Sequence, residues 1–535
     1  MPRHSTATML AGLALVHIGG VVCLTTPSAP SGFWGRGMAG KTAFAGSTRG
    51  RGALGWRPLK MALDPEMQQG EREVVVKKWR RRELGRIVKL ALPALSIPLA
   101  DPIMSLVDSV CIGRYSTTLD LAALGPNLVI FNFVSFSFAF LAITTTIRAS
   151  RALAARDTRE AGRAISTSTM IAFTAGTFFA LILFFFPGAA LATTGALPEI
   201  LASAESYCRV RALAIPAVLV TMVLQSGLLA QRDSLTCLLS VLAASSFNIV
   251  GDIILINSFG MGLVGAAWAT LAGNYLSCIV LLVLGYSGKK EGAVKLEKHI
   301  PSFAEMRLFS KALGPQLLFS MLKNVCYLML QSVATQFSTA TCAAHQALWS
   351  VWAVLSFCPT PLEQAAQVFL PSYLVTAQEE EENAKRSTPP VFSKAREFSK
   401  TLGGLSAGAG ALLAAMAAVS TLFPGALASD PSLWPIMVTF RPYMMLSLLC
   451  GALSIAGDGV LTALGDIEYL WRCQAANVAV LAVWLFWGVP RFGRGILGVW
   501  EGVCVFMVMR LLTNAVRLFR PNGILGSKAA ATQQP

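Results

Sequence analysis

The chain has 535 residues, of which 54% are hydrophobic and only 13% charged, and its mean hydropathy is +0.59. Soluble domains average about 25% charged residues, so this composition excludes an ordinary soluble protein. The formal net charge is +16. However, the basic residues lie mainly near the N-terminus and between apolar stretches, without interleaved aromatic residues. This distribution indicates membrane topology and not a nucleic-acid-binding surface.

The composition of residues 1–70 predicts a targeting presequence. No acidic residue occurs before Asp64, while Ser, Thr, Gly and basic residues are frequent. The apolar run 9–24 has the length of a signal-peptide hydrophobic region, and the acid-free stretch after it is typical of a transit peptide. Together they resemble the bipartite presequences of algae with secondary plastids, in which Phe33 or Phe44 would follow the signal cleavage point. The alternative is a basic tail with one weakly apolar run.

Apolar stretches of about 20 residues recur along the rest of the chain, and each is long enough to cross a bilayer as a helix. They are continuous runs and not the short alternating segments of a β-barrel. The sequence therefore predicts an all-α membrane protein with twelve transmembrane helices. The expected spans are 87–112, 121–147, 163–187, 208–230, 236–257, 262–285, 308–333, 342–371, 401–424, 436–463, 469–489 and 496–518.

A polar linker at 286–307 divides these spans into an N-terminal six-helix lobe (71–285) and a C-terminal six-helix lobe (308–519), followed by a polar tail (520–535). The segments 229–233 (LAQRD) and 462–466 (TALGD) follow the fourth span of each lobe, which indicates a duplication. Because each lobe has an even number of spans, the two repeats are expected to run parallel.

Loop charge predicts the orientation of the spans. The loop after span 2, the central linker and the loop after span 8 are rich in Lys and Arg, and they share a side with the basic amphipathic segment 76–89. Both termini should therefore face the positive-inside compartment, the stroma or cytosol. The opposite loops are expected to hold few cations, among them Arg209 and Arg211.

The few ionisable residues inside the spans are the candidate functional residues. A carboxylate at the centre of a membrane helix costs roughly 2.5–3.5 kcal/mol on insertion scales. Asp101 and Asp108 of span 1 lie seven residues apart, on nearly the same helix face. The others are Asn248 and Asp252 in span 5, Lys323 in span 7, Glu363 in span 8 and Asp458 in span 10. The cysteines form no metal-ligand pattern, and no nucleotide, haem or nucleophile motif points to an enzyme or a bound cofactor.

At these positions the sequence resembles the multidrug and toxic compound extrusion (MATE) family, in particular its DinF-like plant branch, which includes a chloroplast-envelope salicylate exporter. The resemblance extends from about residue 84 to residue 519. The matching motifs are PIMSLVDS (102–109), LAALGP (121–126), the Asn248-x-x-x-Asp252 pair, AAHQ (343–346), PLEQAAQ (361–367), Asp458-Gly459 and DIEY (466–469).

The resemblance implies a secondary transporter in which two lobes rock about a substrate site. It assigns a cation-coupling site to Asp108, Asn248 and Asp252, with H⁺ or Na⁺ as the coupling ion. A carboxyl group held away from water beside a second carboxylate binds a proton more readily, which agrees with this role. The alternative is a buried hydrogen-bonded pair that only joins helices. The expected activity is export of a small organic solute by antiport, with an aromatic or organic anion favoured. We expect a monomer in the plastid envelope.

In the C-terminal lobe the sequence departs from sodium-coupled relatives, because span 7 carries Lys323 where they have a glutamate. Lys323, Glu363 and Asp458, with Gln331 as a cavity-lining residue, are predicted to form an ionic cluster that attracts an anionic substrate. A permanent structural salt bridge is the alternative. Asp101 also lies outside the family pattern, beside a helix bend expected at Pro102. It is a further cation-coupling candidate that would ligate water or the ion at the bend, and the alternative is that it only faces the lumen of the N-terminal lobe.

A lipid-linked substrate flippase of the wider superfamily is the alternative function. It would need a large cationic cavity, and only Lys323 stands out as a candidate cation for one.

Overall fold

The computed structural model describes residues 69–194, 198–287, 294–297, 303–334, 336–383, 391–427, 431–520 and 523–526. Over these ranges the secondary structure is helical and includes no strand, which confirms the predicted all-α class. Nearly all of the predicted presequence, with Phe33 and Phe44, and most of the polar tail lie outside the described residues. All described helices belong to one compact unit that begins at Pro65.

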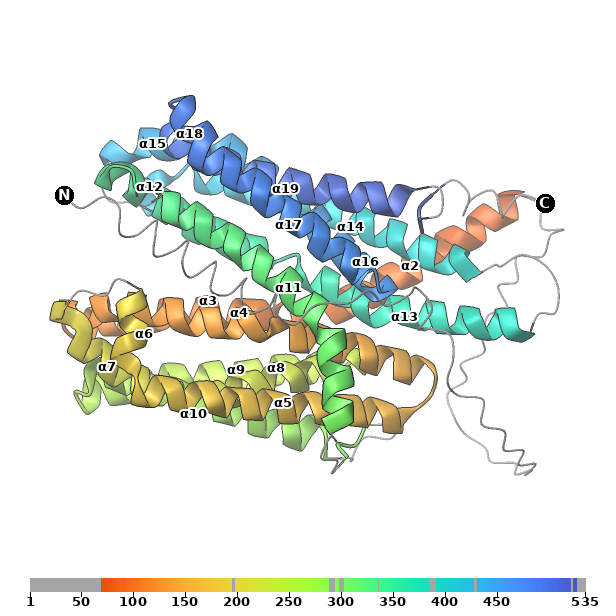
Figure 1. Ribbon diagram of the computed structural model, residues 1–535, viewed down its shortest axis with the longest axis horizontal. Coiled ribbons are helices and arrows are strands. Elements are labelled where there is room, and N and C mark those ends of the chain that lie inside the picture. The colour runs from red at the N-terminus through yellow and green to blue at the C-terminus, as the bar shows by residue number, and fades with distance from the viewer. Residues whose placement is uncertain are drawn as a thin grey trace. The chain divides into compact units, whose positions relative to one another are not determined.

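The first half of the chain forms a bundle of long helices (Figure 1). Polar residues begin three of them: the side chains of Thr117, Asp157 and Asp233 accept hydrogen bonds from backbone N–H groups three residues later, as N-caps do. In chain order the helices are α2 (Gln69–Ala94), α3 (Ser96–Tyr115), α4 (Thr118–Ala154), α5 (Thr158–Phe185), α6 (Pro187–Thr193), α7 (Pro198–Ala212), α8 (Ile215–Ala230), α9 (Ser234–Asp252), the π-helical η1 (Ile253–Ser258), α10 (Gly262–Val280) and the π-helical η2 (Leu281–Gly285).

The second half forms a matching bundle, in which Ser338 caps the first short helix after the long α11. Its helices are α11 (Phe303–Ala334), α12 (Thr339–Phe357), α13 (Thr360–Asn383), α14 (Val391–Ser420), η3 (Pro424–Ala426), η4 (Pro431–Leu433), α15 (Trp434–Thr439), α16 (Arg441–Leu464), α17 (Ile467–Val483), the π-helical η5 (Trp484–Gly488), α18 (Val489–Arg491) and α19 (Gly495–Phe519).

Within the described residues, ten helices are long and apolar enough to cross a membrane, and an eleventh span arises if the pair α7–α8, bent by 46°, is counted as one. The chain is therefore a multi-pass membrane protein. The predicted span 342–371 is divided between α12 and α13 and is not among these helices. His345 and Gln346 lower the hydropathy of α12. The fourth span also differs from the prediction, because its helix begins at Pro198 and not at residue 208.

The two halves repeat the same backbone features at a constant separation of 233 residues. Left-handed residues occur in matching pairs: Arg232 with Gly465, Gly260 with Gly493, and Gly262 with Gly495. Each pair lies at the turn before a corresponding helix, where a positive φ is least costly for glycine. The short motifs seen in the sequence are therefore parts of a longer structural repeat in which both halves run in the same direction.

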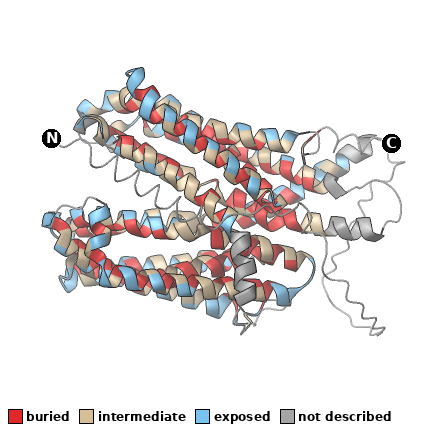
Figure 2. Ribbon diagram, in the orientation of Figure 1, coloured by how far each residue is buried: buried red, intermediate tan, exposed pale blue. Residues whose placement is uncertain are grey.

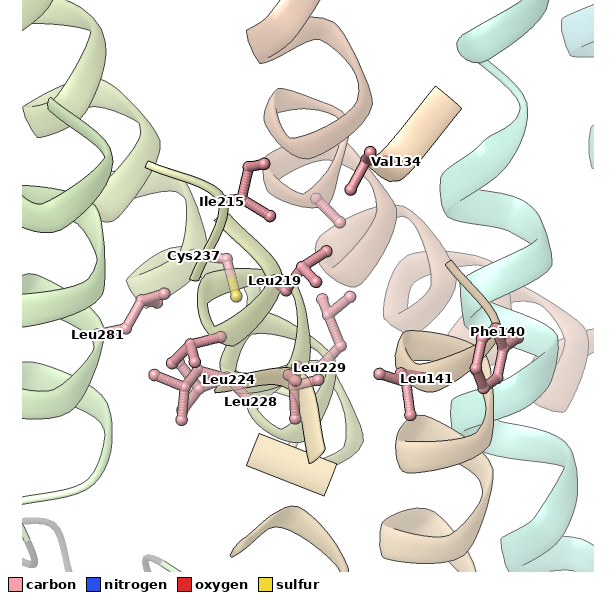
Figure 3. Packing of buried hydrophobic residues seen from close by; sticks show 14 of the residues in the cluster. Val134, Phe140, Leu141, Ile215, Leu219, Leu224, Leu228, Leu229, Cys237 and Leu281 are labelled. Atoms are coloured by element: carbon pink, nitrogen blue, oxygen red, sulfur yellow. The ribbon is translucent and has the colours of Figure 1, made fainter. Parts of the chain in front are cut away.

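Buried residues lie inside both bundles and where the two bundles meet (Figure 2). One apolar core extends from Leu141 in α4 and Leu224 in α8 to Phe369 in α13 and Phe398 in α14. Figure 3 shows part of it, where the leucines of α8 pack between α4 and η2. Helix α4 packs against α11 and α13, and α2 packs against α13 and α14. The bundles are thus joined through α2, α4, α11, α13 and α14.

Polar contacts join the bundles at the end where the basic loops lie, and we call them the basic-face network. The Tyr373 hydroxyl of α13 donates to Glu83 Oε2 of α2 at 2.6 Å, and Arg86 Nη1 contacts Glu83 Oε1 at 2.6 Å. The guanidinium of Arg232 lies over the Phe369 ring, 4.9 Å from its centroid. Further contacts are the Arg80–Glu397 ion pair and the bond from Arg151 Nη2 to the Ala463 carbonyl at 3.0 Å.

Candidate functional site

Three of the predicted coupling residues meet inside the N-terminal bundle. Asp108 lies on α3, and Asn248 and Asp252 lie one turn apart on α9, which packs against α3. All three are buried. With the Asn248 amide oriented to satisfy both of its groups, its nitrogen donates to Asp108 Oδ1 at 3.2 Å. Its oxygen then accepts from Thr270 Oγ1 at 3.0 Å and from the Thr270 backbone N–H at 3.2 Å.

The two carboxyl groups of Asp108 and Asp252 lie within hydrogen-bonding reach of each other. Within the described residues, Asp252 Oδ1 is buried and receives no hydrogen bond. Two ionised carboxylates close together repel each other, so this arrangement favours a shared proton or a cation between them.

Arg211 and Tyr207 lie on α7, and the sequence reasoning singled out neither as a candidate functional residue. Arg211 was expected in a loop, but it lies in the last turn of α7, just before the bend into α8. It interacts electrostatically with Asp101, Asp108 and Asp252, and Tyr207 lies one turn earlier on the same helix. The predicted fourth span already included residue 211, so an arginine inside an apolar span was the available signal.

Asp101 and Pro102 lie on α3, nearly two turns before Asp108. Asp101 is exposed and within electrostatic range of Arg211. Helix α3 is continuous through Pro102, and the helical assignment is interrupted at Leu95, after Pro93. The bend expected at Pro102 stays a prediction. A proline removes a hydrogen bond from the turn before it, and here the backbone accommodates Pro102 within a continuous helix.

In the C-terminal bundle, Asp458 of α16 is fully partnered by two residues of α19 that the sequence reasoning did not single out. Arg510 Nη2 donates to Asp458 Oδ2 at 2.5 Å, and Asn514 Nδ2 donates to Asp458 Oδ1 at 2.7 Å. All three side chains are buried. Arg510 lies in the middle of a predicted span, so it could have been recognised as an intramembrane cation.

Lys323 and Glu363 lie beside this pair. Glu363 is buried, accepts a hydrogen bond from Gln367 Nε2 at 3.3 Å, and interacts electrostatically with Lys323, Asp458 and Arg510. The Lys323 ammonium lies over the Phe319 ring, 4.9 Å from its centroid. Within the described residues no carboxylate lies within ion-pair distance of Lys323.

Gln331 does not join this cluster. It lies eight residues after Lys323 on α11, which is about 12 Å along a helix. Its Oε1 contacts His345 Nε2 at 3.2 Å, and the His345 ring packs between the rings of Trp349 and Trp500. Gln331 and His345 therefore form a separate, partly buried polar contact.

Two repeated helix bundles, one with a buried carboxylate pair and one with a buried ionic cluster, define a multi-pass membrane protein of the transporter class. Sequence and structure comparisons give the family. A family model described as "MatE" matches residues 93–254. The chain is 32% identical to "Protein DETOXIFICATION 47, chloroplastic" of Arabidopsis thaliana over 85% of its length and 82% of the relative. It is 28% identical to "Protein DETOXIFICATION 44, chloroplastic" of the same plant, over 84% of its length and 85% of the relative.

A solved structure of a "multidrug resistance MATE family transporter" in an outward-facing conformation superposes with a TM-score of 0.70. It is 17% identical and covers 85% of this chain and 97% of its own. The chain belongs to the MATE family of membrane transporters, which confirms the resemblance seen in the sequence motifs.

Proposed function

We propose that this protein is a proton-coupled secondary transporter that exports a small organic anion. The observation that carries the proposal is the buried Asp108–Asp252 carboxyl pair, whose closeness favours a shared proton or a bound cation. A carboxyl pair that changes charge inside a membrane bundle has a different solvation energy in each conformation. Proton binding therefore shifts the equilibrium between inward-open and outward-open states, as coupling requires.

An anionic substrate is favoured by the C-terminal bundle. Lys323 holds a positive charge inside the membrane region and lies against the Phe319 ring. A cation that is not fixed by an ion pair remains available to a substrate carboxylate. This feature supports an anionic cargo.

A plastid location is favoured by two observations. The first 63 residues carry no acidic residue, and two relatives of the chain are described as chloroplastic. We place the protein in a plastid membrane with its termini on the positive-inside side. The physical basis for that orientation is the excess of Lys and Arg in the basic-face loops.

The direct test is transport by the purified protein in proteoliposomes, with radiolabelled salicylate as the probe. Vesicles acidic inside should take up salicylate while their pH gradient collapses. A weak acid that permeates passively accumulates on the alkaline side, so uptake into an acidic lumen reports antiport.

The variants Asp108→Asn and Asp252→Asn should each abolish uptake driven by the pH gradient. Asp157→Asn is the matched control, because Asn caps a helix as well as Asp does and residue 157 lies outside the site. Unchanged coupling in both site variants contradicts the proposal. Scrambling of labelled lipid without salicylate uptake would identify a flippase instead.

A further inference from the structure

Helix α2 carries exposed cations on the side that faces away from the two bundles. We propose that this side is a binding site for an anionic membrane lipid. The phosphate or sulfonate headgroup contacts Arg81 and Arg82, and the acyl chain lies along the exposed apolar residues that follow them on the helix. The inference goes beyond the proposed transport function and does not depend on the solute that is transported.

The first turns of α2 extend beyond the apolar part of the membrane. The candidate span Val76–Ser109 has 34 residues and is about 51 Å long at a rise of about 1.5 Å per residue, whereas the hydrocarbon core of a bilayer is about 30 Å thick. No charged residue occurs between residues 90 and 100, so the surplus length lies at the N-terminal end. The cations of α2 are therefore at the level of the lipid headgroups.

One side of α2 packs against the rest of the protein. The Trp79 ring meets the Tyr373 ring edge-on, with the centroids 6.1 Å apart, and Glu83, Ile87 and Leu90 are buried. These residues of α2 are spaced three or four apart, as residues on one side of a helix are. The packing therefore fixes the orientation of α2, and its opposite side is turned outward.

The outward side of α2 changes from cationic to apolar along the helix. Residues spaced three or four apart form one stripe there, namely Lys77, Arg81, Leu84, Val88 and Leu92. The two cations are exposed, and the three apolar side chains are 39%, 42% and 69% exposed. A row of exposed apolar side chains on a membrane protein is a contact surface for lipid chains. The stripe thus has the same order as a lipid molecule, a charged head followed by an apolar chain.

The cations at the start of this stripe are available to a headgroup. Lys78, Arg81 and Arg82 are exposed, and within the described residues none of them pairs with a carboxylate. By contrast, Arg80 on the packed side pairs with Glu397. Clusters of Lys and Arg beside a transmembrane helix attract anionic lipids, and each cation strengthens the binding about fivefold. Guanidinium groups also match the oxygen atoms of a phosphate or sulfonate in geometry.

The test measures lipid binding to the purified full-length protein in detergent micelles. The protein is titrated with phosphatidylglycerol or phosphatidylcholine, bound lipid is counted by native mass spectrometry, and the unfolding temperature is recorded. Phosphatidylglycerol should bind more tightly and raise the unfolding temperature more than phosphatidylcholine does. Glycerol phosphate should have no such effect, because it lacks the acyl chains. An equal effect of glycerol phosphate would indicate a site for soluble anions and overturn the proposal.

Arg81→Gln/Arg82→Gln should weaken phosphatidylglycerol binding about thirtyfold, because two cations are lost, while Arg81→Lys/Arg82→Lys should retain most of it. The matched control is Arg156→Gln/Arg159→Gln, which removes two exposed cations at the turn between α4 and α5, on the same basic face. It should bind like the wild type. An equal loss in the control would mean that only net charge matters, and the proposal would be wrong. A wild type without preference for phosphatidylglycerol overturns it even if the variants fail to fold.

Discussion

Replacing Arg510 by leucine leaves Asp458 buried without its cation. The two side chains are 3% and 2% exposed, and the Nη2–Oδ2 contact is 2.5 Å long. Breaking a buried ion pair from one side costs about 3–5 kcal/mol, because the remaining charge stays desolvated. Asn514 still donates to Asp458, so we expect a loss at the lower end, about 3 kcal/mol in the free energy of unfolding.

The assay is denaturant unfolding in detergent micelles of the single variant and of the double variant Asp458→Asn/Arg510→Leu. The double variant should recover most of the loss, because no uncompensated charge remains. Arg472→Ala is the control: this exposed Arg472–Glu468 pair on α17 should contribute about 0.3–0.5 kcal/mol. Equal destabilisation of the single and double variants would refute the reasoning, since packing and not charge would then dominate.

Three further results are expected. Lys323→Gln should raise the KM for salicylate about tenfold, equivalent to about 1.4 kcal/mol. Expression and unfolding temperature should stay normal, whereas the loss of a structural salt bridge would lower both. Tyr373→Phe removes the hydrogen bond to Glu83, worth about 0.5–1.5 kcal/mol, and should speed hydrogen exchange of the amides in α2 and α13. Gly262→Ala should lower the unfolding temperature more than Gly495→Ala does. Both glycines have a positive φ, but only an added Cβ at residue 262 would contact other atoms, at 2.8 Å from Ser116 Oγ.

The helices and the carboxylate pair could be predicted because each depends on local sequence. Long apolar runs predict spans wherever they occur. Asn248 and Asp252 are one turn apart on a single helix, and Asp108 is a rare charge in another, so their types and positions were sufficient to single them out. What the sequence could not show is that the Asn248 amide also contacts Thr270 of α10, at 3.0 Å from its Oγ1.

The two charged residues that the sequence reasoning missed, Arg211 and Arg510, are arginines, a residue type usually interpreted as a signal of membrane topology. Arg211 follows Arg209 by two residues and was interpreted as a loop cation, although Pro216 in the first turn of α8 marks the break between α7 and α8. The pairing of Arg510 with Asp458 depends on the packing of α16 against α19, two helices separated by α17, η5 and α18 in the chain. Such a distant pairing requires the tertiary structure.

The basic-face network has a consequence for the resting protein. Opening the bundles at that end breaks the hydrogen bond from Tyr373 to Glu83 and the contact of Arg232 with Phe369. The ligand-free protein should therefore be closed on its basic face most of the time. Solute arriving from that side binds only the minor open fraction, so its apparent affinity falls in proportion to that fraction. Capture from the basic face is then limited by how often the network opens, and variants that weaken it should bind solute from that side more readily.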